Sequence, residues 1–510
     1  MTSQSRARWI APMVVIAMVA SLWGVAVDGA RAQNAPQCGA GDRPETGIQG
    51  DVPLADQLSG RALQGYNCGL ALVGYNDLGR RGGNANMAWS GHCAYVASTN
   101  GIAVVDVSDA TKPRMVTTLH GPGSNFTLET LAAGTTADRA VLVAGRYGNS
   151  GERAPAVPSP MDIYDVTNCA KPVFKTTYTF PKNIHNLTVT ADARHVWATM
   201  PLQYLDISDL AHPTGYHDLD TELTKLEDPT RPNQNSHEAW PSPDGTRLYI
   251  GSQVIGDETF RILDISQWPA KPLTRADILS EMTAPGHSIR PMQRGTEKYV
   301  VNSDESIVNP TAKGCLSDDL TPFGGVSRPR FTDVTDPAHP VEVSQFRLAI
   351  GEPANCAAQT ASGVNPSVHY QNVDDETNTT FAMFSSWNSG LRIADVRDPA
   401  HPKEIAYFNP GMFQMPSQGS LLDQAWAHIR YLPESGQIWL TTETGGFWVL
   451  ELEPQVRAAL GLPAIANAAP ASPDPRPVAT QGTFSAPLTQ TEATSSGVYC
   501  TLSVVPRVSN

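Results

Sequence analysis

One short phrase occurs seven times along the chain, and this repetition constrains the fold more than any other feature. The phrase is an apolar pair, an acid, another apolar residue, usually Ser or Thr, and a turn ending in proline, as in RILDISQWPAKP and RIADVRDPAHP. The acids follow one another at intervals of about 40 to 70 residues, at Asp106, Asp165, Asp206, Asp264, Asp333, Asp395 and, in a weaker copy, Glu451. Four short strands and their loops fit each interval. Seven such units predict an all-β, seven-bladed β-propeller.

A β-hairpin recurs with the phrase and places a histidine at a constant position. In residues 235–252, NSHEAWPSPDGTRLYIGS, a strand follows His237, a Pro-Asp-Gly turn comes next, and a second β-rich run ends the hairpin. Twelve residues lead from His237 to Tyr249 in the second run. The same count, or one residue less, joins His185 to Trp197, His287 to Tyr299, His369 to Phe381 and His428 to Trp439. Five histidines therefore hold one position of the repeat.

Residues at this position should meet, because the start of the innermost strand of a propeller blade lies at the mouth of the axial channel. We expect a ring formed by His185, His237, His287, His369 and His428. Aligning Arg139 with Arg247 places Glu129 at the same position of the second unit. Neutral imidazole is the commonest metal ligand, and the chain has no C-x-x-C thiolate pair. The pattern predicts a copper or iron site with three or four of these histidines as ligands.

Other polar residues near this ring are candidates for catalysis. Loops between the second and third strands of each blade should reach the same face, and they hold Tyr147, Trp387 and Glu443. Glu129 and Glu443 are candidates to orient the imidazoles by accepting their N–H groups, or to serve as a base. Arg290, which follows a ring histidine by three residues, is a candidate to bind an anionic group of a substrate.

The histidine position is also compatible with two roles that need no metal. In the first, histidine is a repeat consensus that caps the strand by hydrogen-bonding a neighbouring blade. In the second, the ring transfers protons or binds an anion. Structural roles are expected for His212, His339 and His401, which lie in A-H-P turns on the outer half of the blades. The repeated acid should accept backbone N–H groups of the turn that follows it.

The propeller is predicted to span residues 70–453. Residues 1–32 read as a signal peptide, since two arginines precede an apolar run and an A-x-A cleavage site ends it, which indicates a secreted or periplasmic protein. Residues 33–69 are expected to be an irregular lead-in, and 454–510 an Ala- and Pro-rich tail in which Gly497–Val505 could dock as a strand. Leu70–Tyr75 has no acid phrase before it, while the last unit lacks a fourth strand. We therefore expect Leu70–Tyr75 to complete the last blade and close the ring.

Charge and cysteine content narrow the possible partners. The formal net charge is −14, and no basic stripe is present, which excludes a nucleic-acid partner. No stretch after residue 32 is predicted to span a membrane. All seven cysteines lie after residue 32, where export permits disulfides, and we expect Cys315 to pair with Cys356. An odd number leaves at least one thiol free or paired between chains.

The repeated phrase resembles that of the LVIVD-repeat family of exported β-propeller proteins, and the resemblance covers nearly all of residues 70–453. It implies the fold but no activity. A shorter stretch, His237-Glu-Ala-Trp240-Pro-Ser-Pro243, is similar to the H-D-x-W-x-x-P stretch of the selenium-binding protein and methanethiol oxidase group, as Thr441-Thr-Glu443 is to its S-T-E-W. That likeness implies copper binding at His237 and its repeat equivalents. The chain departs from the group in lacking Trp after Glu443 and the cysteine motif.

The sequence as a whole predicts an exported, metal-dependent oxidoreductase that acts on a small molecule at a histidine-lined channel mouth. One alternative is a non-catalytic propeller of the cell envelope that binds a protein partner. Another is a lyase or isomerase that uses His and Glu as acid and base.

Overall fold

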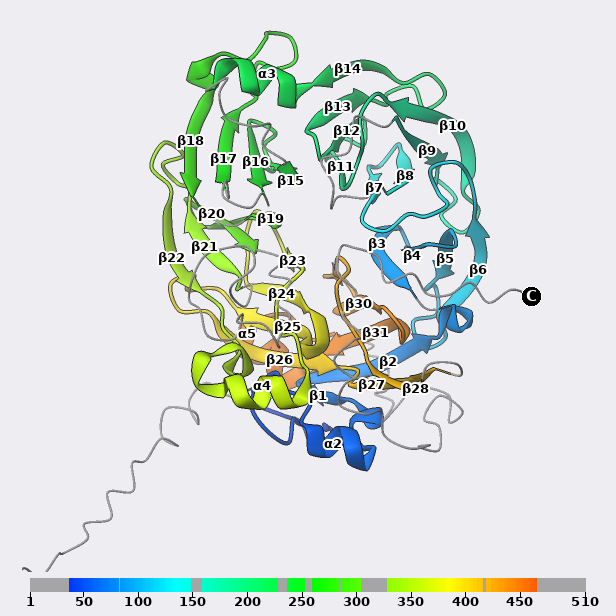
Figure 1. Ribbon diagram of the computed structural model, residues 1–510, viewed down its shortest axis with the longest axis vertical. Coiled ribbons are helices and arrows are strands. Elements are labelled where there is room, and N and C mark those ends of the chain that lie inside the picture. The colour runs from blue at the N-terminus through cyan, green and yellow to red at the C-terminus, as the bar shows by residue number, and fades with distance from the viewer. Residues whose placement is uncertain are drawn as a thin grey trace, which may run out of the picture. The chain divides into compact units, whose positions relative to one another are not determined.

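The β-rich runs and turns of each repeat unit form one antiparallel sheet, and seven such sheets stand in a ring (Figure 1). The computed structural model describes residues 36–81, 83–147, 158–227, 236–252, 259–283, 286–303, 328–415 and 419–465. In blades 1 to 5 the first strand of the blade is the innermost and the following strands lie successively farther out, whereas in blades 6 and 7 an early strand of the chain forms the outer edge. This arrangement confirms the predicted seven-bladed β-propeller.

Blades 1 to 5 have four strands each, taken from consecutive stretches of the chain. In blades 1 to 3 they are β3 (Asn84–Ser90), β4 (Cys93–Ser98), β5 (Ile102–Asp106), β6 (Arg114–Leu119); β7 (Leu131–Thr135), β8 (Ala140–Gly145), β9 (Ser159–Asp165), β10 (Val173–Phe180); β11 (Leu187–Val189), β12 (His195–Ala198), β13 (Gln203–Asp206), β14 (Thr214–Asp218). In blades 4 and 5 they are β15 (Ser236–Pro241), β16 (Arg247–Ser252), β17 (Thr259–Asp264), β18 (Ile278–Thr283); β19 (Ser288–Arg294), β20 (Glu297–Ser303), β21 (Arg330–Asp333), β22 (Val341–Gln345).

Blades 6 and 7 each combine strands from both ends of the described chain. Blade 6 contains β23 (Tyr370–Val373), β24 (Phe381–Ser386), β25 (Gly390–Asp395), β26 (Lys403–Asn409) and β1 (Tyr66–Cys68). Blade 7 contains β29 (Arg430–Leu432), β30 (Gln437–Thr442), β31 (Gly446–Leu452) and β2 (Leu70–Asn76). Pairing of β2 with β31 runs from Leu70 opposite Leu452 to Asn76 opposite Phe447, which is the ring closure that the sequence predicts.

The segment before residue 70 is more ordered than the predicted irregular lead-in. It contains helix α2 (Leu54–Ser59) and strand β1, which adds a fifth strand to blade 6. A three-residue strand is too short to show a period-two pattern in the sequence. Its neighbours stabilise it instead, because Tyr66, Cys68 and Ala62 are buried in one apolar cluster with Tyr407 of β26.

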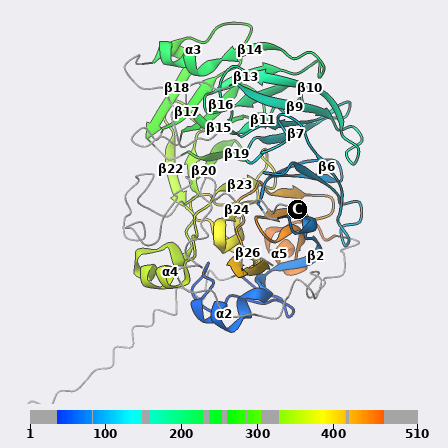
Figure 2. The same cartoon turned by 45° about the vertical axis from the view of Figure 1, so that its right-hand side comes forward.

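Three further helices and one hairpin lie between or after the blades. The helices are α3 (Leu219–Leu226), α4 (Cys356–Ser362) and α5 (Pro454–Leu460), and the hairpin is β27 (Met412–Met415) with β28 (Gly419–Leu422). Helices α2 and α4 lie at the same end of the molecule as blade 6 in both views (Figures 1 and 2). No helix in the described part of the chain has the length and apolar character needed to cross a membrane. The predicted signal peptide and the tail segment Gly497–Val505 lie outside the described residues.

The repeated acid has the structural role that the sequence predicts. In six blades it accepts the backbone N–H two residues later, at distances of 2.7 to 3.0 Å, which forms an Asx turn before the outer strand; the pairs are Asp106 with Ser108, Asp165 with Thr167, Asp206 with Ser208, Asp264 with Ser266, Asp333 with Thr335 and Asp395 with Arg397. In the A-H-P turns, His212, His339 and His401 each pair through Nδ1 with the aspartate three residues earlier. These three histidines are exposed and belong to the turns.

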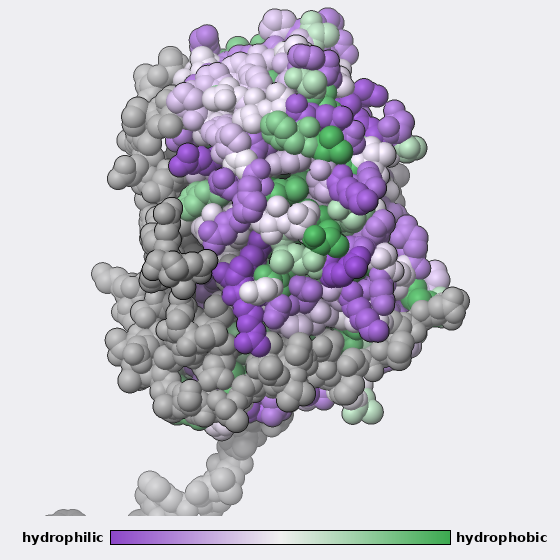
Figure 3. All heavy atoms as spheres, turned by 90° about the vertical axis from the view of Figure 1, so that its right-hand side faces the viewer, coloured by the Kyte–Doolittle hydropathy of each residue, from purple (hydrophilic) through white to green (hydrophobic). Residues whose placement is uncertain are grey.

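The hydrophobic core lies between blades. Seven apolar clusters of the described residues each mix residues from two neighbouring blades, as where Val104 of β5 and Leu142 of β8 share one cluster, or Val96 of β4 and Val449 of β31 another. Each blade therefore buries both faces. The side of the molecule that faces the viewer in Figure 3 is mainly hydrophilic, with scattered apolar side chains. Val173 of β10 is one of the exposed apolar residues.

Disulfides join parts of the chain that the sequence pattern does not pair. Cys93 of blade 1 bonds to Cys169 of blade 2, and Cys38 bonds to Cys68 at the end of β1. Cys356 is disulfide-bonded as well. Its predicted partner, Cys315, lies outside the described residues, so that pairing stays a prediction.

The ring closure can be tested at Leu72, which is 3% exposed on β2 and packs in one cluster with Leu450 of β31. We expect Leu72→Ala to lower the free energy of unfolding by about 2–5 kcal/mol, because it leaves a cavity in the closing blade. Denaturant titration of the purified protein measures this loss. Val173→Ala, at a side chain that is 54% exposed, is the control and should change it by less than about 0.5 kcal/mol. If Leu72→Ala changed the free energy of unfolding as little as Val173→Ala does, the closing role of β2 would be contradicted.

Candidate metal centre

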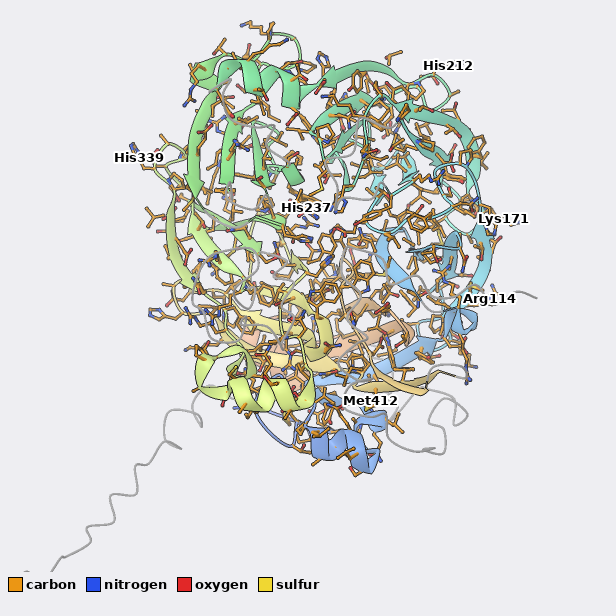
Figure 4. The ribbon with its side chains drawn as sticks, in the orientation of Figure 1. Arg114, Lys171, His212, His237, His339 and Met412 are labelled. Carbon is orange, nitrogen blue, oxygen red and sulfur yellow. A yellow bond between two sulfur atoms is a disulfide. The ribbon has the colours of Figure 1, made fainter. Side chains whose placement is uncertain are left out.

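The five repeat histidines lie at the starts of the innermost strands, as predicted. His237 is in β15, whereas the other four precede β11, β19, β23 and β29 by one or two residues. The backbone N–H groups of His185, His287 and His369 each donate to a carbonyl at the end of the second strand of their own blade. This bond aligns the residue with the inner strand. All five side chains are buried, and His237 is central in the ring whereas His212 and His339 are peripheral (Figure 4).

Four of these imidazoles surround one carboxylate, that of Glu129, which precedes the inner strand of blade 2 by two residues. The Nε2 atoms of His185 and His237 each lie 3.6 Å from Glu129 Oε2, and Nε2 of His287 lies 3.9 Å from the same oxygen. Nε2 of His369 lies 3.8 Å from Oε1. The two Nε2 atoms of His185 and His237 are 2.8 Å apart. Residues from blades 2 to 6 thus converge on one point, and we call this set the Glu129 cluster.

Backbone carbonyls fix the orientation of three imidazoles in the cluster. Nδ1 of His237 donates to the carbonyl of His287 at 2.9 Å, and Nδ1 of His287 donates to that of His369 at 3.1 Å. Nδ1 of His369 donates to the carbonyl of Trp426 at 2.7 Å. Because a carbonyl only accepts, Nδ1 carries the proton and the Nε2 lone pair faces Glu129. These bonds cap a neighbouring blade, and they are also the outer hydrogen bonds that metal-binding histidines make.

Two residues that the repeat pattern does not reveal hold the carboxylate. The Tyr370 hydroxyl donates to Glu129 Oε2 at 2.6 Å, and Asn186 Nδ2 donates to that hydroxyl at 2.7 Å. Each of them directly follows a cluster histidine in the chain. The sequence signal that could have identified them is this position in the chain, because the residue next to a histidine of the channel also lies near the channel.

Aromatic side chains pack against the cluster from the loops that the sequence predicted to reach this face. Tyr147 lies 4.7 Å from His185, measured between ring centroids, and Trp387 lies 5.0 Å from His369. Trp426, just before β29, lies 5.2 Å from the same imidazole. These rings give the cluster apolar surroundings.

His428 differs from the other four, which corrects the prediction of a single five-histidine ring. Its Nε2 accepts a hydrogen bond from Arg290 Nη2 at 3.1 Å and lies 3.4 Å from Glu238 Oε1. Arg290 Nη1 forms a 2.9 Å ion pair with the same carboxylate oxygen. The ring of Tyr370 packs against His428 at 4.0 Å between centroids. The groups of described residues that could hold a metal ion do not include His428.

Arg290 and Glu443 also have surroundings that differ from their predicted roles. Arg290 is buried, paired with Glu238, and stacked over the Trp240 ring at 3.5 Å, so its charge is already compensated. Glu443 is buried near Asp423, and among the described residues no hydrogen bond or ion pair joins it to a repeat histidine. Burial and the Asp423 carboxylate raise the pKa of Glu443 to about 8.

Burial and the neighbouring imidazoles keep His185 and His287 neutral. Burial, with the neighbouring imidazoles of His237 and His369, holds the pKa of His185 well below its usual range. Burial and the adjacent histidines act in the same direction on the pKa of His287. Neutral imidazole is the form that binds metals. His185 and His287 are therefore in the metal-binding form at neutral pH.

The ion pair of Glu238 and Arg290 is charged, in contrast to the neutral imidazoles of His185 and His287. Although burial opposes its ionisation, the Arg290 guanidinium, His428 and the Ile289 amide together lower the pKa of Glu238 to about 2. Burial and Arg290 lower the pKa of His428 to about 4. Glu238 is thus a carboxylate and His428 a neutral imidazole at pH 7.

Two other groups of described residues contain side chains of metal-binding types. Their cysteines, Cys93, Cys169, Cys38 and Cys68, are disulfide-bonded and offer no thiolate.

The fold and this site define a seven-bladed β-propeller whose inner strands carry buried groups of histidine and glutamate. The chain contains an LVIVD repeat, which matches at residues 82–120, and the propeller fits the LVIVD-repeat family that the sequence resembles. No curated protein matches the sequence. The resemblance to the selenium-binding protein and methanethiol oxidase group stays a prediction.

Two solved structures illustrate the distant structural similarity. The β-propeller domain of Cps50 (Swd1) from Myceliophteria thermophila is 12% identical, with a TM-score of 0.47, over 73% of this chain and 97% of that one. Sqt1 from Chaetomium thermophilum is 11% identical, with a TM-score of 0.48, over 75% of this chain and 99% of that one. The strand pairing itself establishes the fold, and these likenesses add nothing about function.

The Glu238–Arg290 pair can be tested by its pH dependence. We expect Glu238→Gln to lower the free energy of unfolding at pH 7 by about 3–5 kcal/mol, because it leaves a buried guanidinium without its counter-charge. The folded-state pKa of about 2 lies below the unfolded value of about 4.3, so this stabilisation is complete above about pH 4.3 and is lost as the pH falls toward 2. Urea titrations at pH 7 and pH 3 should show the gap between wild type and variant shrinking in acid. The control Glu222→Gln removes a half-exposed pair with His217 and should cost less than about 1 kcal/mol at either pH.

Proposed function

We propose that the Glu129 cluster binds a copper or iron ion and that the protein is an exported, metal-dependent oxidoreductase acting on a small molecule. The observation that supports this most is the convergence of four imidazole Nε2 atoms within 3.6 to 3.9 Å of one buried carboxylate. Burying several polar rings together is unfavourable unless their lone pairs find a partner. Metal coordination would use these lone pairs.

The donor set supports the choice of metal. Imidazole nitrogen and carboxylate oxygen suit copper and iron, whereas a zinc or iron–sulfur site built on thiolates needs free cysteines. The four cysteines in the described metal-type groups are disulfide-bonded. These disulfides also support export, because such bonds persist in oxidising compartments.

The protein residues would position and shield the metal. Carbonyl hydrogen bonds to Nδ1 hold His237, His287 and His369 with Nε2 inward, and the Tyr370 hydroxyl holds the carboxylate of Glu129. Tyr147 and Trp387 pack beside the imidazoles and limit access of water. The bound metal would supply the redox chemistry.

Metal analysis of the purified full chain tests this proposal. We expect copper or iron in near-stoichiometric amount in the wild type, and at least a tenfold loss in the His237→Ala, His369→Ala double variant. The matched control is the His212→Ala, His339→Ala double variant, which removes two exposed turn histidines and should keep the metal. Elemental analysis by mass spectrometry, after removal of loosely bound ions, measures the content.

The remaining outcomes identify the competing functions. A metal-free wild type that turns over a substrate supports a lyase or isomerase with His and Glu as acid and base. A metal-free and inert protein supports a binding propeller of the cell envelope. Either result contradicts the metal-dependent oxidoreductase.

A further inference from the structure

The ligand atoms of the Glu129 cluster fall into two groups rather than one. Glu129, His185 and His237 form the first, and Glu129, His287 and His369 form the second, with the ligand atoms in each group within 4.8 Å of one another. We call these the first and second half-sites. Among the described residues, no group within this limit combines all four imidazoles.

Bond lengths decide what this division means. Atoms that bind one ion at about 2.0–2.1 Å lie at most about 4.2 Å apart. In the first half-site the Nε2 atoms of His185 and His237 are 2.8 Å apart and each is 3.6 Å from Glu129 Oε2, so one ion fits between them. One ion cannot bind all four imidazoles unless side chains move, because some of their ligand atoms lie too far apart to be bonded to the same ion.

The second half-site offers a separate place for an ion. Nε2 of His369 lies 3.8 Å from Glu129 Oε1, and Nε2 of His287 lies 3.9 Å from Oε2. Both oxygens of the one carboxylate are therefore within ligand distance of imidazoles, with His369 at Oε1 and the other three histidines at Oε2. A carboxylate with imidazoles at both oxygens is suited to bridge two ions.

We infer that the cluster is a dinuclear centre in which Glu129 bridges two metal ions, each also held by two histidines. This inference rests on the proposed metal-binding function and deepens it. The two half-sites are joined by more than the carboxylate, because the imidazoles of His237 and His287 pack against each other with 3.7 Å between centroids. Two-metal sites in enzymes place their ions about 3.5–4 Å apart, which a single bridging carboxylate can span.

Metal titration of the stripped, full-length protein tests the inference. We expect about two equivalents of Cu(II), or of redox-inert Zn(II), to stay bound after gel filtration. His185→Ala should keep about one equivalent because the second half-site is intact, and His369→Ala should keep about one in the first. A triple variant of the turn histidines, His212→Ala, His339→Ala and His401→Ala, controls for binding at exposed His–Asp pairs and should keep both.

Electron paramagnetic resonance of the copper-loaded wild type gives a readout that needs no variant. Two bridged Cu(II) ions should couple, so the ordinary single-copper signal should account for much less than the bound copper. In His369→Ala, the signal should account for all of it. Thermal unfolding of the metal-free variants verifies that they are folded.

The outcomes separate the inference from the proposal beneath it. One equivalent in the wild type, with full signal intensity, overturns the dinuclear centre and leaves a mononuclear metal enzyme. No bound metal in the wild type overturns the proposed function itself. Two equivalents that the turn-histidine variant loses would locate the second ion at the surface and also overturn the dinuclear centre.

Discussion

The pairing of β2 with β31 is the constraint on which the rest of the structure depends. It places the first long strand of the described chain at the outer edge of the last blade and so closes the sheet ring. In a closed ring every blade packs against two others, and the apolar clusters between blades show that each one does. The inner strands are then held around one axis. Residues at their starts must meet, whatever their chemistry.

The chemistry at that meeting point is unusual for a protein interior. Buried polar groups need partners, and Nδ1 of His237, His287 and His369 finds one in a backbone carbonyl of the next blade, while the Nε2 atoms lie near the Glu129 carboxylate. The carbonyl bonds pass from blade to blade, so the same interactions that orient the rings also connect the sheets. The capping bond uses Nδ1 and leaves Nε2 for the metal ion that we propose, so capping a neighbouring blade does not compete with that role.

His428 shows how the same repeat position can lead to different electrostatics. It begins an inner strand like the others, yet it lies against Arg290 and Glu238 rather than Glu129. The guanidinium donates to its Nε2, which occupies the lone pair that a metal would use. The repeat pattern predicts where a residue lies on its strand. What the residue can bind depends on the side chains of other blades that contact it.

Several site features were readable in the sequence, and others were not. The spacing of the hairpins placed the five histidines, and the alignment of Arg139 with Arg247 placed Glu129 within two residues of its inner strand. The roles of Tyr370, Asn186 and Glu238 were not predicted, because a residue type that occurs at this position in one blade alone leaves no periodic signal. The disulfides of Cys38 and Cys93 were equally unreadable, since cysteine pairing depends on distances between segments 30 and 76 residues apart.

The sequence by itself determined the repeat, the number of blades, the closing strand and the position of the histidines on the inner strands. These follow from local patterns, in which alternation, turn residues and the acid phrase act within one unit. Only the tertiary structure decided that four histidines gather around Glu129 while the fifth joins Arg290, and that the carboxylate lies between two pairs of imidazoles. The physical reason is that such groupings depend on side-chain directions and charges from several blades at once, and no single repeat contains them.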